Sequence, residues 1–523
     1  MMGVHQSQAE LFTYSVQLDK RVRPDHPLRQ IAALVDFAFV RAETARFYGR
    51  NGNVSIDPAV ILKLMFLLFF DNVASERELM DMLAERLDYL WFLGFGLDDS
   101  IPDHSVLSKA RSRWGKDVFE SFFVRVVQQC VEKGLVDGQK IHVDSSLIDA
   151  HASKDSVRKG PPELIAALKA AYQAQESKLA HTLTPPAEGA VNDRMVSATD
   201  PDAAIVRKGP DSARPRYHHH RAVDDARGVI TAVGTTPGSI PENSQLLEVI
   251  DRHQQNTRTP AQTIVADHKY GTAENFIACQ QRGLTTHMGD CLSKQRPASC
   301  AGIFPESAFK YQPQSNTYLC PAGQTLKPRR LHPTRRTWEY WLPKRVCAAC
   351  PLRSQCTRSK MGRTLHRHEQ QEMLDQARQQ SHSWQGRRDR KRRQQLIEQS
   401  FADAANNHGF KRSRWRRLWR QQIQDYMIAA IQNLRLLVKH GRIQSPAAAA
   451  GRGAVPARLL QYLAPVAQVW HRPSVREKEG CNSGKPFLSM SSYGLFSSYP
   501  FGQHALDKRP RSREPHGRRA RPF

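Results

Sequence analysis

The chain has 523 residues, of which 77 are Lys or Arg and 50 are Asp or Glu, so its formal net charge is +27. This length allows several domains and a large core, and so strong a positive excess indicates a polyanionic partner, most often nucleic acid. The first 18 residues lack the apolar core of a signal peptide, and the most hydrophobic run, residues 59–70, is too short to span a bilayer. We therefore expect no membrane partner. Nine cysteines in a chain of this size favour a reducing cytoplasm over a disulfide scaffold.

The first 135 residues are expected to be mostly helical. Asp57 followed by Pro58 predicts the start of a helix that carries the apolar run. Ser75 with Glu78 forms a capping box that opens a second helix, extending to about residue 89. Two more helices are expected over residues 103–114 and 118–133.

Arg111 and Arg113 lie on the polar side of the predicted helix 103–114. Short helices with basic faces are compatible with helix-turn-helix DNA binding, and equally with a plain helical bundle. The sequence leaves these two alternatives open, with Arg111 and Arg113 as DNA-binding candidates.

Residues 136–288 predict a mixed α/β sheet, because strand patterns alternate with helical ones. Three consecutive histidines, residues 218–220, lie in one arm of a predicted hairpin and are interpreted as ordinary strand side chains or weak phosphate contacts. The predicted strands cover residues 140–148, 217–223, 229–235, 262–266 and 284–287, and the predicted helices cover residues 162–180, 244–253 and 273–282.

Asp144 directly follows the apolar-leaning residues 140–143, and Asp267 directly follows the predicted strand 262–266. Open α/β sheets bind their ligands at the carboxyl ends of neighbouring strands, so the two acids can meet there. A third acid, Glu398, lies beside an apolar stripe on a very basic helix, where an intrahelical ion pair is the simpler interpretation. Three carboxylates in a basic protein suit phosphoryl transfer with two divalent ions, Mg²⁺ or Mn²⁺. Asp149 is the alternative first ligand. We prefer Asp144 because Asp144 directly follows the strand.

Four cysteines are clustered between residues 320 and 356, namely Cys320, Cys347, Cys350 and Cys356. Four thiolates are enough for a closed tetrahedral zinc site, so we expect structural Zn²⁺; free thiols with one incidental pair are the alternative. Cys291 and Cys300 lie nearby and are possible substitutes.

The segment from residue 386 to 420 is the most basic part of the chain and predicts a helix with a buried stripe. Tryptophans alternate with arginines towards its end, as on a surface that binds a nucleic-acid backbone. A last amphipathic helix, residues 422–440, is expected to pack in the core. The DNA-binding candidates of this segment are Arg392, Arg393, Lys411, Arg412, Arg414 and Arg416.

Several segments resemble the DDE transposases of bacterial insertion sequences. They read HVDSSLIDAHAS, SATDPDA, YHHHRAVDDARGVITAV, IVADHKYGTAENF and IEQSFADAANNHGFKRSRWR, together with DHSVLSKAR and the cysteine-rich YLCPAGQTL…CAACPLRSQCT. The resemblance runs from about residue 10 to 440. It implies a ribonuclease H-like mixed sheet with helices on both faces, a helical amino-terminal domain and a small Cys-rich zinc insertion.

The resemblance also implies roles for individual residues. Asp144, Asp267 and Glu398 would be the metal-binding catalytic triad for cutting transposon ends and joining them to target DNA. Related enzymes often place Tyr, Arg and Lys around the Glu, whereas this chain has Gln394 and Ala405, so Arg392, Arg393 and Lys411 are the candidates to serve instead.

The expected domains follow from the same reading. They are a helical DNA-binding domain (1–135), the first part of the catalytic domain (136–288), the Cys-rich zinc insertion (289–380), a basic helical end carrying the Glu (381–440) and a linker with a basic disordered tail (441–523). The partners expected are double-stranded DNA, as terminal inverted repeats and target, and further copies of the chain on that DNA, acting in the cytoplasm at the nucleoid. The alternatives are a ribonuclease H-like nuclease that never joins ends, and a decayed zinc-containing DNA-binding protein.

Overall fold

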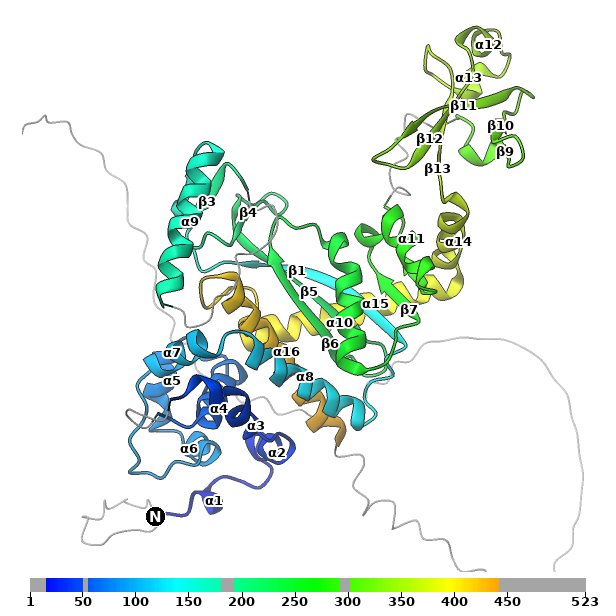
Figure 1. The fold of residues 1–523 in the computed structure, drawn as a ribbon. Helices are drawn as coiled ribbons and strands as arrows, with labels where there is room; N and C mark the ends of the chain where they lie inside the picture. The colour runs from blue at the N-terminus through cyan, green and yellow to red at the C-terminus, as the bar shows by residue number, and fades with distance from the viewer. Residues whose placement is uncertain (1–15, 50–54, 180–191, 292–301, 442–523) are drawn as a thin grey trace, which may run out of the picture. The chain divides into compact units, whose positions relative to one another are not determined.

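The computed structural model describes residues 16–49, 55–179, 192–291 and 302–441 (Figure 1). The tail expected over residues 441–523 therefore lies outside the described residues, except for Gly441, and so does Cys300. Among the helices that are described, none combines the length and the apolar character needed to cross a membrane.

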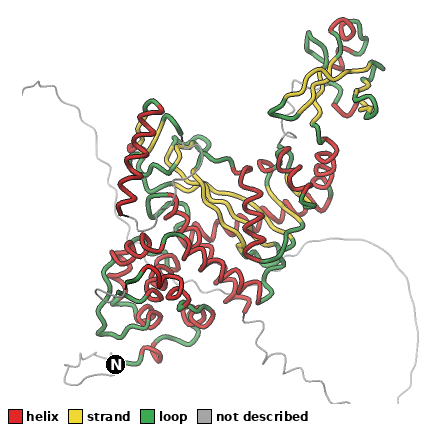
Figure 2. The backbone as a smooth tube through the Cα atoms, in the orientation of Figure 1, coloured by secondary structure: helices red, strands yellow, loops and turns green. Residues whose placement is uncertain are grey.

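The amino-terminal region is helical, as predicted, and is built around α4, Pro58–Phe70 (Figure 2). Asp57 caps this helix by accepting a hydrogen bond from the N–H of Ala59 at 2.9 Å, and nine of its thirteen residues are buried. A helix that is apolar on all sides must be surrounded. The helices of this region besides α4 are α1 (Leu18–Arg21), α2 (Pro27–Leu34), α3 (Phe39–Thr44), α5 (Glu76–Leu83), α6 (Leu87–Leu93), α7 (Ser105–Trp114) and α8 (Asp117–Glu132).

One prediction in this region needs correction. The helix expected to run from Ser75 to about residue 89 is two helices, α5 and α6, because the chain turns between them. Ser75 does cap α5 by accepting a hydrogen bond from the N–H of Glu78 at 3.1 Å.

The central sheet is mixed, with the order β6–β5–β1–β7–β8, and β4 also pairs with β5. β5 runs antiparallel to β1 and β6, whereas β7 is parallel to both β1 and β8. The strands are β1 (Lys140–Asp149), β4 (Ala204–Val206), β5 (Arg214–Asp224), β6 (Ile230–Pro237), β7 (Thr263–Ala266) and β8 (Thr285–Met288), with β2 (Val157–Lys159) and β3 (Met195–Ser197) pairing separately. The long helix α9 (Pro162–Leu179) follows β2.

Both faces of this sheet are covered, because successive side chains of a strand point to opposite sides. Ile141 and Val143 of β1 pack in a core with α10 (Leu246–Thr257) and α11 (Ala273–Gln281). Ile148 of the same strand belongs to a second core, which it shares with α4, α8 and α16 (Leu418–Gly441).

Residues 302–368 form a five-stranded antiparallel sheet in the order β13–β12–β11–β10–β9. Its small core contains Phe309, Leu326, Tyr340 and Leu365. The elements of this insertion are β9 (Lys310–Gln312), β10 (Thr317–Leu319), β11 (Thr325–His332), β12 (Thr337–Trp341), α12 (Lys344–Ala348), α13 (Arg353–Cys356) and β13 (Thr364–His368), and α14 (Gln371–His382) follows it.

The basic helix α15 covers Trp384–His408 and ends at Gly409, whose φ of 63° is left-handed. The prediction of one helix through residue 420 is therefore wrong beyond His408. Residues 409–417 form a loop that crosses the end of β1, where Asp149 and Arg412 form an isolated bridge. α16 is largely buried and confirms the expected core-packing helix.

Candidate functional site

Asp144 lies in the middle of β1 and not at its end, because pairing with β5 continues as far as Asp149. Its Oδ2 accepts a hydrogen bond at 2.8 Å from the guanidinium of Arg393, and its Oδ1 accepts one at 2.8 Å from the backbone N–H of Ser145. Burial raises the pKa of Asp144, and the charge of Arg393 opposes that rise. This carboxylate is held in a fixed orientation, with only 21% of its side chain exposed.

Asp267 directly follows β7, at the level of Asp144. The parallel register pairs Lys140 with Thr263 and His142 with Val265, and two more residues along each strand lead to Asp144 and Asp267. The negative charge of Asp267 contributes to the raised pKa of Asp144, which reflects their closeness. The Oδ1 of Asp267 accepts a hydrogen bond at 2.8 Å from the N–H of Lys269 and so caps the following turn. Two of the three predicted acids therefore come together.

Glu398 lies elsewhere on the surface of α15. Its neighbour Ile397 is buried, whereas Glu398 itself is exposed. The residue of α15 that reaches Asp144 is Arg393, five positions earlier. Five residues turn an α-helix by about 140° beyond a full turn, so the two side chains leave the helix in different directions. The structure does not bring Glu398 to the two aspartates.

The alternative acid, Asp149, is engaged in another way. Its Oδ1 accepts a hydrogen bond from Arg216 at 2.7 Å, and Arg214 lies 3.7 Å from its Oδ2. The odd-numbered Asp149 also projects from the face of β1 opposite to Asp144.

The donor set at Asp144 and Asp267 has the right chemistry for a hard divalent ion, since both residues offer carboxylate oxygens from neighbouring strands. Among the residues that the structure describes, however, no three His, Cys, Asp or Glu side chains are arranged to hold a metal ion. As the side chains stand, Arg393 supplies the positive charge beside Asp144.

Five of the predicted DNA-binding cations lie near the two aspartates or the end of β1, and the side chains of the other three point elsewhere. Lys411, Arg412 and Arg416 are exposed around the end of β1, and the ammonium of Lys411 lies 2.7 Å from the Oγ of Ser146. Arg392 and Arg393 of α15 pair with Asp225 and Asp144, respectively.

The remaining three cations contact other side chains of the protein. Arg111 is 3% exposed, pairs with Glu76 and lies 3.9 Å from the ring centre of Trp415, so it is not presented to a phosphate. Arg113 stacks on Tyr48 at 4.9 Å. Burial lowers the pKa of Arg414 to about 10, and this side chain binds Asn72 at 2.8 Å.

Sequence reasoning missed the polar network beneath Asp144. Arg221 of β5 is paired in register with Asp144 and is completely buried. Its Nε donates to the Nε2 of His219 at 2.9 Å, and its Nη donates to Ser400 of α15 at 2.7 Å. His219 in turn lies 3.0 Å from the carboxylate of Asp425 on α16, and burial lowers its pKa to about 4.

This network corrects the interpretation of the histidine run as phosphate contacts, because all three histidines are buried. His218 and His220 do share a face, with ring centres 4.6 Å apart. A run of three polar residues inside a strand, followed by arginine, was the available signal of buried hydrogen bonding.

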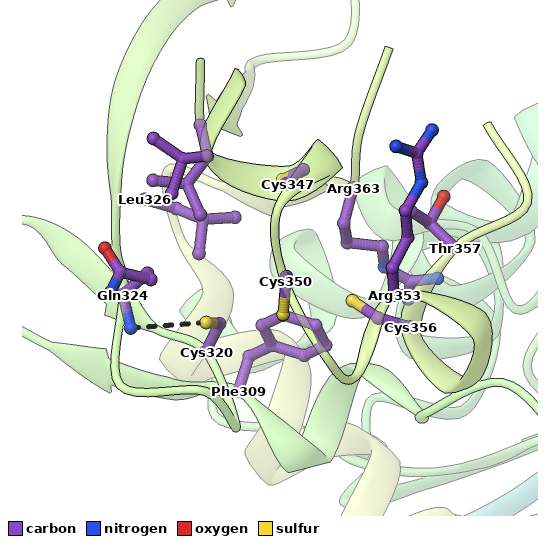
Figure 3. A pocket seen from close by; sticks show the side chains of 12 residues that line it. Phe309, Cys320, Gln324, Leu326, Cys347, Cys350, Arg353, Cys356, Thr357 and Arg363 are labelled. Carbon is purple, nitrogen blue, oxygen red and sulfur yellow. Dashed lines mark hydrogen bonds between the residues drawn. The ribbon is translucent and has the colours of Figure 1, made fainter. Parts of the chain in front are cut away.

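The four clustered cysteines line one small cavity of about 30 Å³ in the insertion (Figure 3). The Sγ of Cys320 accepts a hydrogen bond from the N–H of Gln324 at 3.3 Å. A Cβ added at Gly362, whose φ is +98°, would lie 3.0 Å from the Sγ of Cys347. The chain thus closes tightly around the thiols, although as placed they do not form a group arranged to hold a metal.

Comparisons with known proteins matched two segments. Residues 16–113 match a family described as a transposase domain, and residues 319–438 match a family described as a transposase DDE domain. The second range includes the cysteines and Glu398, whereas Asp144 and Asp267 lie between the two ranges. The comparison with curated proteins gave no match.

Two solved structures show a distant likeness. A cryo-EM structure of the piggyBac transposase synaptic complex with hairpin DNA is 9% identical, with 80% of this chain and 76% of that chain covered and a TM-score of 0.31. The Mos1 transposase paired-end complex with left transposon end is 10% identical, with 47% of this chain and 64% of that chain covered and a TM-score of 0.14. At these scores neither likeness bears on the fold.

Proposed function

We propose that this DNA transposase, a member of the insertion-sequence DDE transposases, cuts and joins DNA with Asp144, Asp267 and Glu398 as the ligands of two divalent ions. The observation that carries this proposal is that the parallel register of β1 and β7 brings Asp144 and Asp267 to the same level, near the exposed cations Lys411, Arg412 and Arg416. The strand order around them suits a ribonuclease H-like core.

The residues around this pair have distinct tasks. Ser145 and Lys269 hold one oxygen of each aspartate through their backbone N–H groups, and the other oxygen of Asp144 is paired with Arg393. Lys411, Arg412 and Arg416 lie where they can neutralise DNA phosphates. Bound Mg²⁺ or Mn²⁺ would activate a water or a 3′-hydroxyl and stabilise the leaving oxygen.

Glu398 is the third ligand in this proposal because it lies on α15, a helix that contacts β1, β7 and β8, and within the matched DDE segment. Glu398 is exposed and apart from the two aspartates in the structure, so in this proposal the site is completed only when metal and DNA are bound. The guanidinium of Arg393 would then leave Asp144 and pair with a DNA phosphate.

The four cysteines of the insertion would bind one structural Zn²⁺. This zinc site is supported by chemistry, because the four thiols line one cavity and thiolates are preferred zinc ligands.

The domain scheme is likewise a proposal: residues 1–135 would bind the transposon ends, together with cations of α15 and the loop after it. Two ends must be brought together, so a homo-oligomer would form on the DNA, in the cytoplasm at the nucleoid.

A cleavage assay tests the triad. The substrate is linear DNA that carries the inverted repeats flanking the gene, incubated with Mg²⁺. Asp144→Asn, Asp267→Asn and Glu398→Gln are each expected to abolish cutting while retaining binding to the repeats in a mobility-shift assay. Cutting that survives all three substitutions would contradict the assignment.

A further inference from the structure

Glu242, in the turn after β6, contacts the segments that follow both aspartates. From these contacts we infer that Glu242 is a positioning residue: it ties Ser145 to Lys269 and thereby fixes the separation of Asp144 and Asp267. This inference rests on the proposed role of the two aspartates as metal ligands.

The first contact is to β1. The Oγ of Ser145 donates a hydrogen bond to one carboxylate oxygen of Glu242. The same Oγ lies 3.0 Å from the Nε2 of His218, whose Nδ1 lies 3.1 Å from the carbonyl oxygen of Ile240. Ile240 is only two residues before Glu242, so the turn is joined to the sheet at two points.

The second contact is to the turn after β7. The ammonium of Lys269 lies 2.6 Å from the other carboxylate oxygen of Glu242. Only 13% of the Glu242 side chain is exposed, compared with 60% of the Lys269 side chain. Both oxygens of this half-buried carboxylate therefore have partners. A charged group that is largely removed from water and has a partner on each oxygen is held in one orientation.

Ser145 and Lys269 play matching parts. Each donates its backbone N–H to the Oδ1 of an aspartate at 2.8 Å, Ser145 to Asp144 and Lys269 to Asp267. Each also gives its side chain to Glu242. Glu242 is thus linked to both aspartates through a single intervening residue on each side, and a shift of either strand end would break one of these links.

The consequence is a preset distance between the two acids. Residues that hold metal ligands from outside commonly change metal affinity by about 10- to 100-fold when they are substituted. Glu242 also keeps the ammonium of Lys269 beside the two aspartates. There the ammonium can contact the phosphodiester of a bound DNA substrate.

The test compares Glu242→Gln with Glu248→Gln. Glu248 is a matched control because its carboxylate also lies 2.6 Å from a cation, Arg252, but on α10 and without contact to either aspartate. Mn²⁺ binding to the full chain without DNA is measured by electron paramagnetic resonance, and the Mg²⁺ concentration for half-maximal cleavage is measured on repeat DNA. We expect Glu242→Gln to weaken Mn²⁺ binding by about 10-fold and to raise the half-maximal Mg²⁺ concentration similarly, with Glu248→Gln unchanged.

If a melting experiment shows that Glu242→Gln does not fold, Ser145→Ala tests the same contact from its other side. It removes the hydroxyl but not the backbone N–H, so it should weaken Mn²⁺ binding in the same direction. Asp144→Asn is the control that must lose Mn²⁺. If it does, a folded Glu242→Gln or Ser145→Ala variant that binds Mn²⁺ as tightly as the wild type would overturn the role of Glu242. Unchanged Mn²⁺ affinity in Asp144→Asn overturns the proposed metal site itself, which separates the two failures.

Discussion

Arg393 places a guanidinium on the carboxylate that the reaction needs. Its Nη lies 2.8 Å from the Oδ2 of Asp144, and only 14% of its side chain is exposed. A divalent ion must share or displace this contact, so Arg393 and the ion compete for Asp144 until DNA offers the guanidinium a phosphate.

Arg393→Gln is therefore expected to change metal binding and DNA binding in opposite directions. Without DNA, the variant should bind Mn²⁺ more tightly, by roughly threefold or more, because a competing charge at short range is removed. Its affinity for repeat DNA should fall, with a slope of log affinity against log salt that is smaller by about 0.9.

Arg388→Gln is the control for this experiment, since Arg388 is an exposed cation of the same helix that stacks on Trp384 at 5.6 Å. Identical metal affinities in Arg393→Gln, Arg388→Gln and the wild type would show that the ion pair does not compete.

Among the elements, the turn after β7 depends on one glycine. A Cβ added at Gly271 would lie 1.8 Å from the carbonyl oxygen of Gly289, and that neighbour is backbone, which cannot rotate away. Gly271→Ala is expected to lower the free energy of unfolding by at least about 2 kcal/mol, or to displace the turn that holds Asp267.

Gly234→Ala is the comparison, because its new methyl would meet only the Cβ of His220 at an ordinary 3.8 Å. Urea unfolding and the cleavage rate of both variants are measured together. Equal stability and equal cleavage in the two variants would refute the close approach at Gly271.

Much of this element-level arrangement was predictable from sequence. The α4 helix and the strands β1 and β5 to β8 follow from apolar periodicity and local capping. The nearness of Asp144 and Asp267 follows from the rule that open α/β sheets bind ligands at the carboxyl ends of neighbouring strands. The end of α15 at Gly409 was missed, because arginine-rich residues beyond it continue to favour a helix while the loop is held by β1.

The partners of Glu242 were not predictable for a different reason. Its contacts with Ser145 and Lys269 span 97 and 27 positions of the chain and arise only from sheet topology. Burial of Arg111 was likewise hidden, because its partner tryptophan, Trp415, comes from a distant loop.

The insertion supplies a second element-level prediction. The purified chain should contain about one zinc per molecule, and Cys347→Ser with Cys350→Ser should lose it, because removal of two of four thiolates opens the site. Cys291→Ser, outside the cavity, should keep the metal. Elemental analysis gives the zinc content, and a wild-type chain without zinc would contradict the proposed site.

Across the whole molecule, buried histidines should set the response to acid. Burial lowers the pKa of six histidines in the interior, to about 4 for His219. Their folded-state pKa values lie below the unfolded value of about 6.5, so the unfolded chain takes up protons first. Stability is then full above about pH 6.5 and is lost as the pH falls towards 4. These residues are His218, His219, His220, His253, His287 and His408.

Asp200 acts in the opposite direction, because burial raises its pKa to about 7 and its folded form takes up a proton early. Burial also raises the pKa of Asp144 and Asp224. With six histidines against these three carboxyls, the urea midpoint should decrease as the pH is lowered from about 7.5 to 5. A midpoint that stays level or rises over this interval would show that the histidines are not buried in the neutral form.

The proposed joining of DNA ends by Asp144, Asp267 and Glu398 is tested most directly by strand transfer. DNA that carries pre-cut transposon ends is incubated with the chain, Mg²⁺ and a supercoiled target plasmid, and joined products are counted. The wild type should yield joined products, and Asp267→Asn should yield none while binding the ends as tightly. Ends that are bound but never joined by the wild type, or joined equally well by Asp267→Asn, would contradict the account.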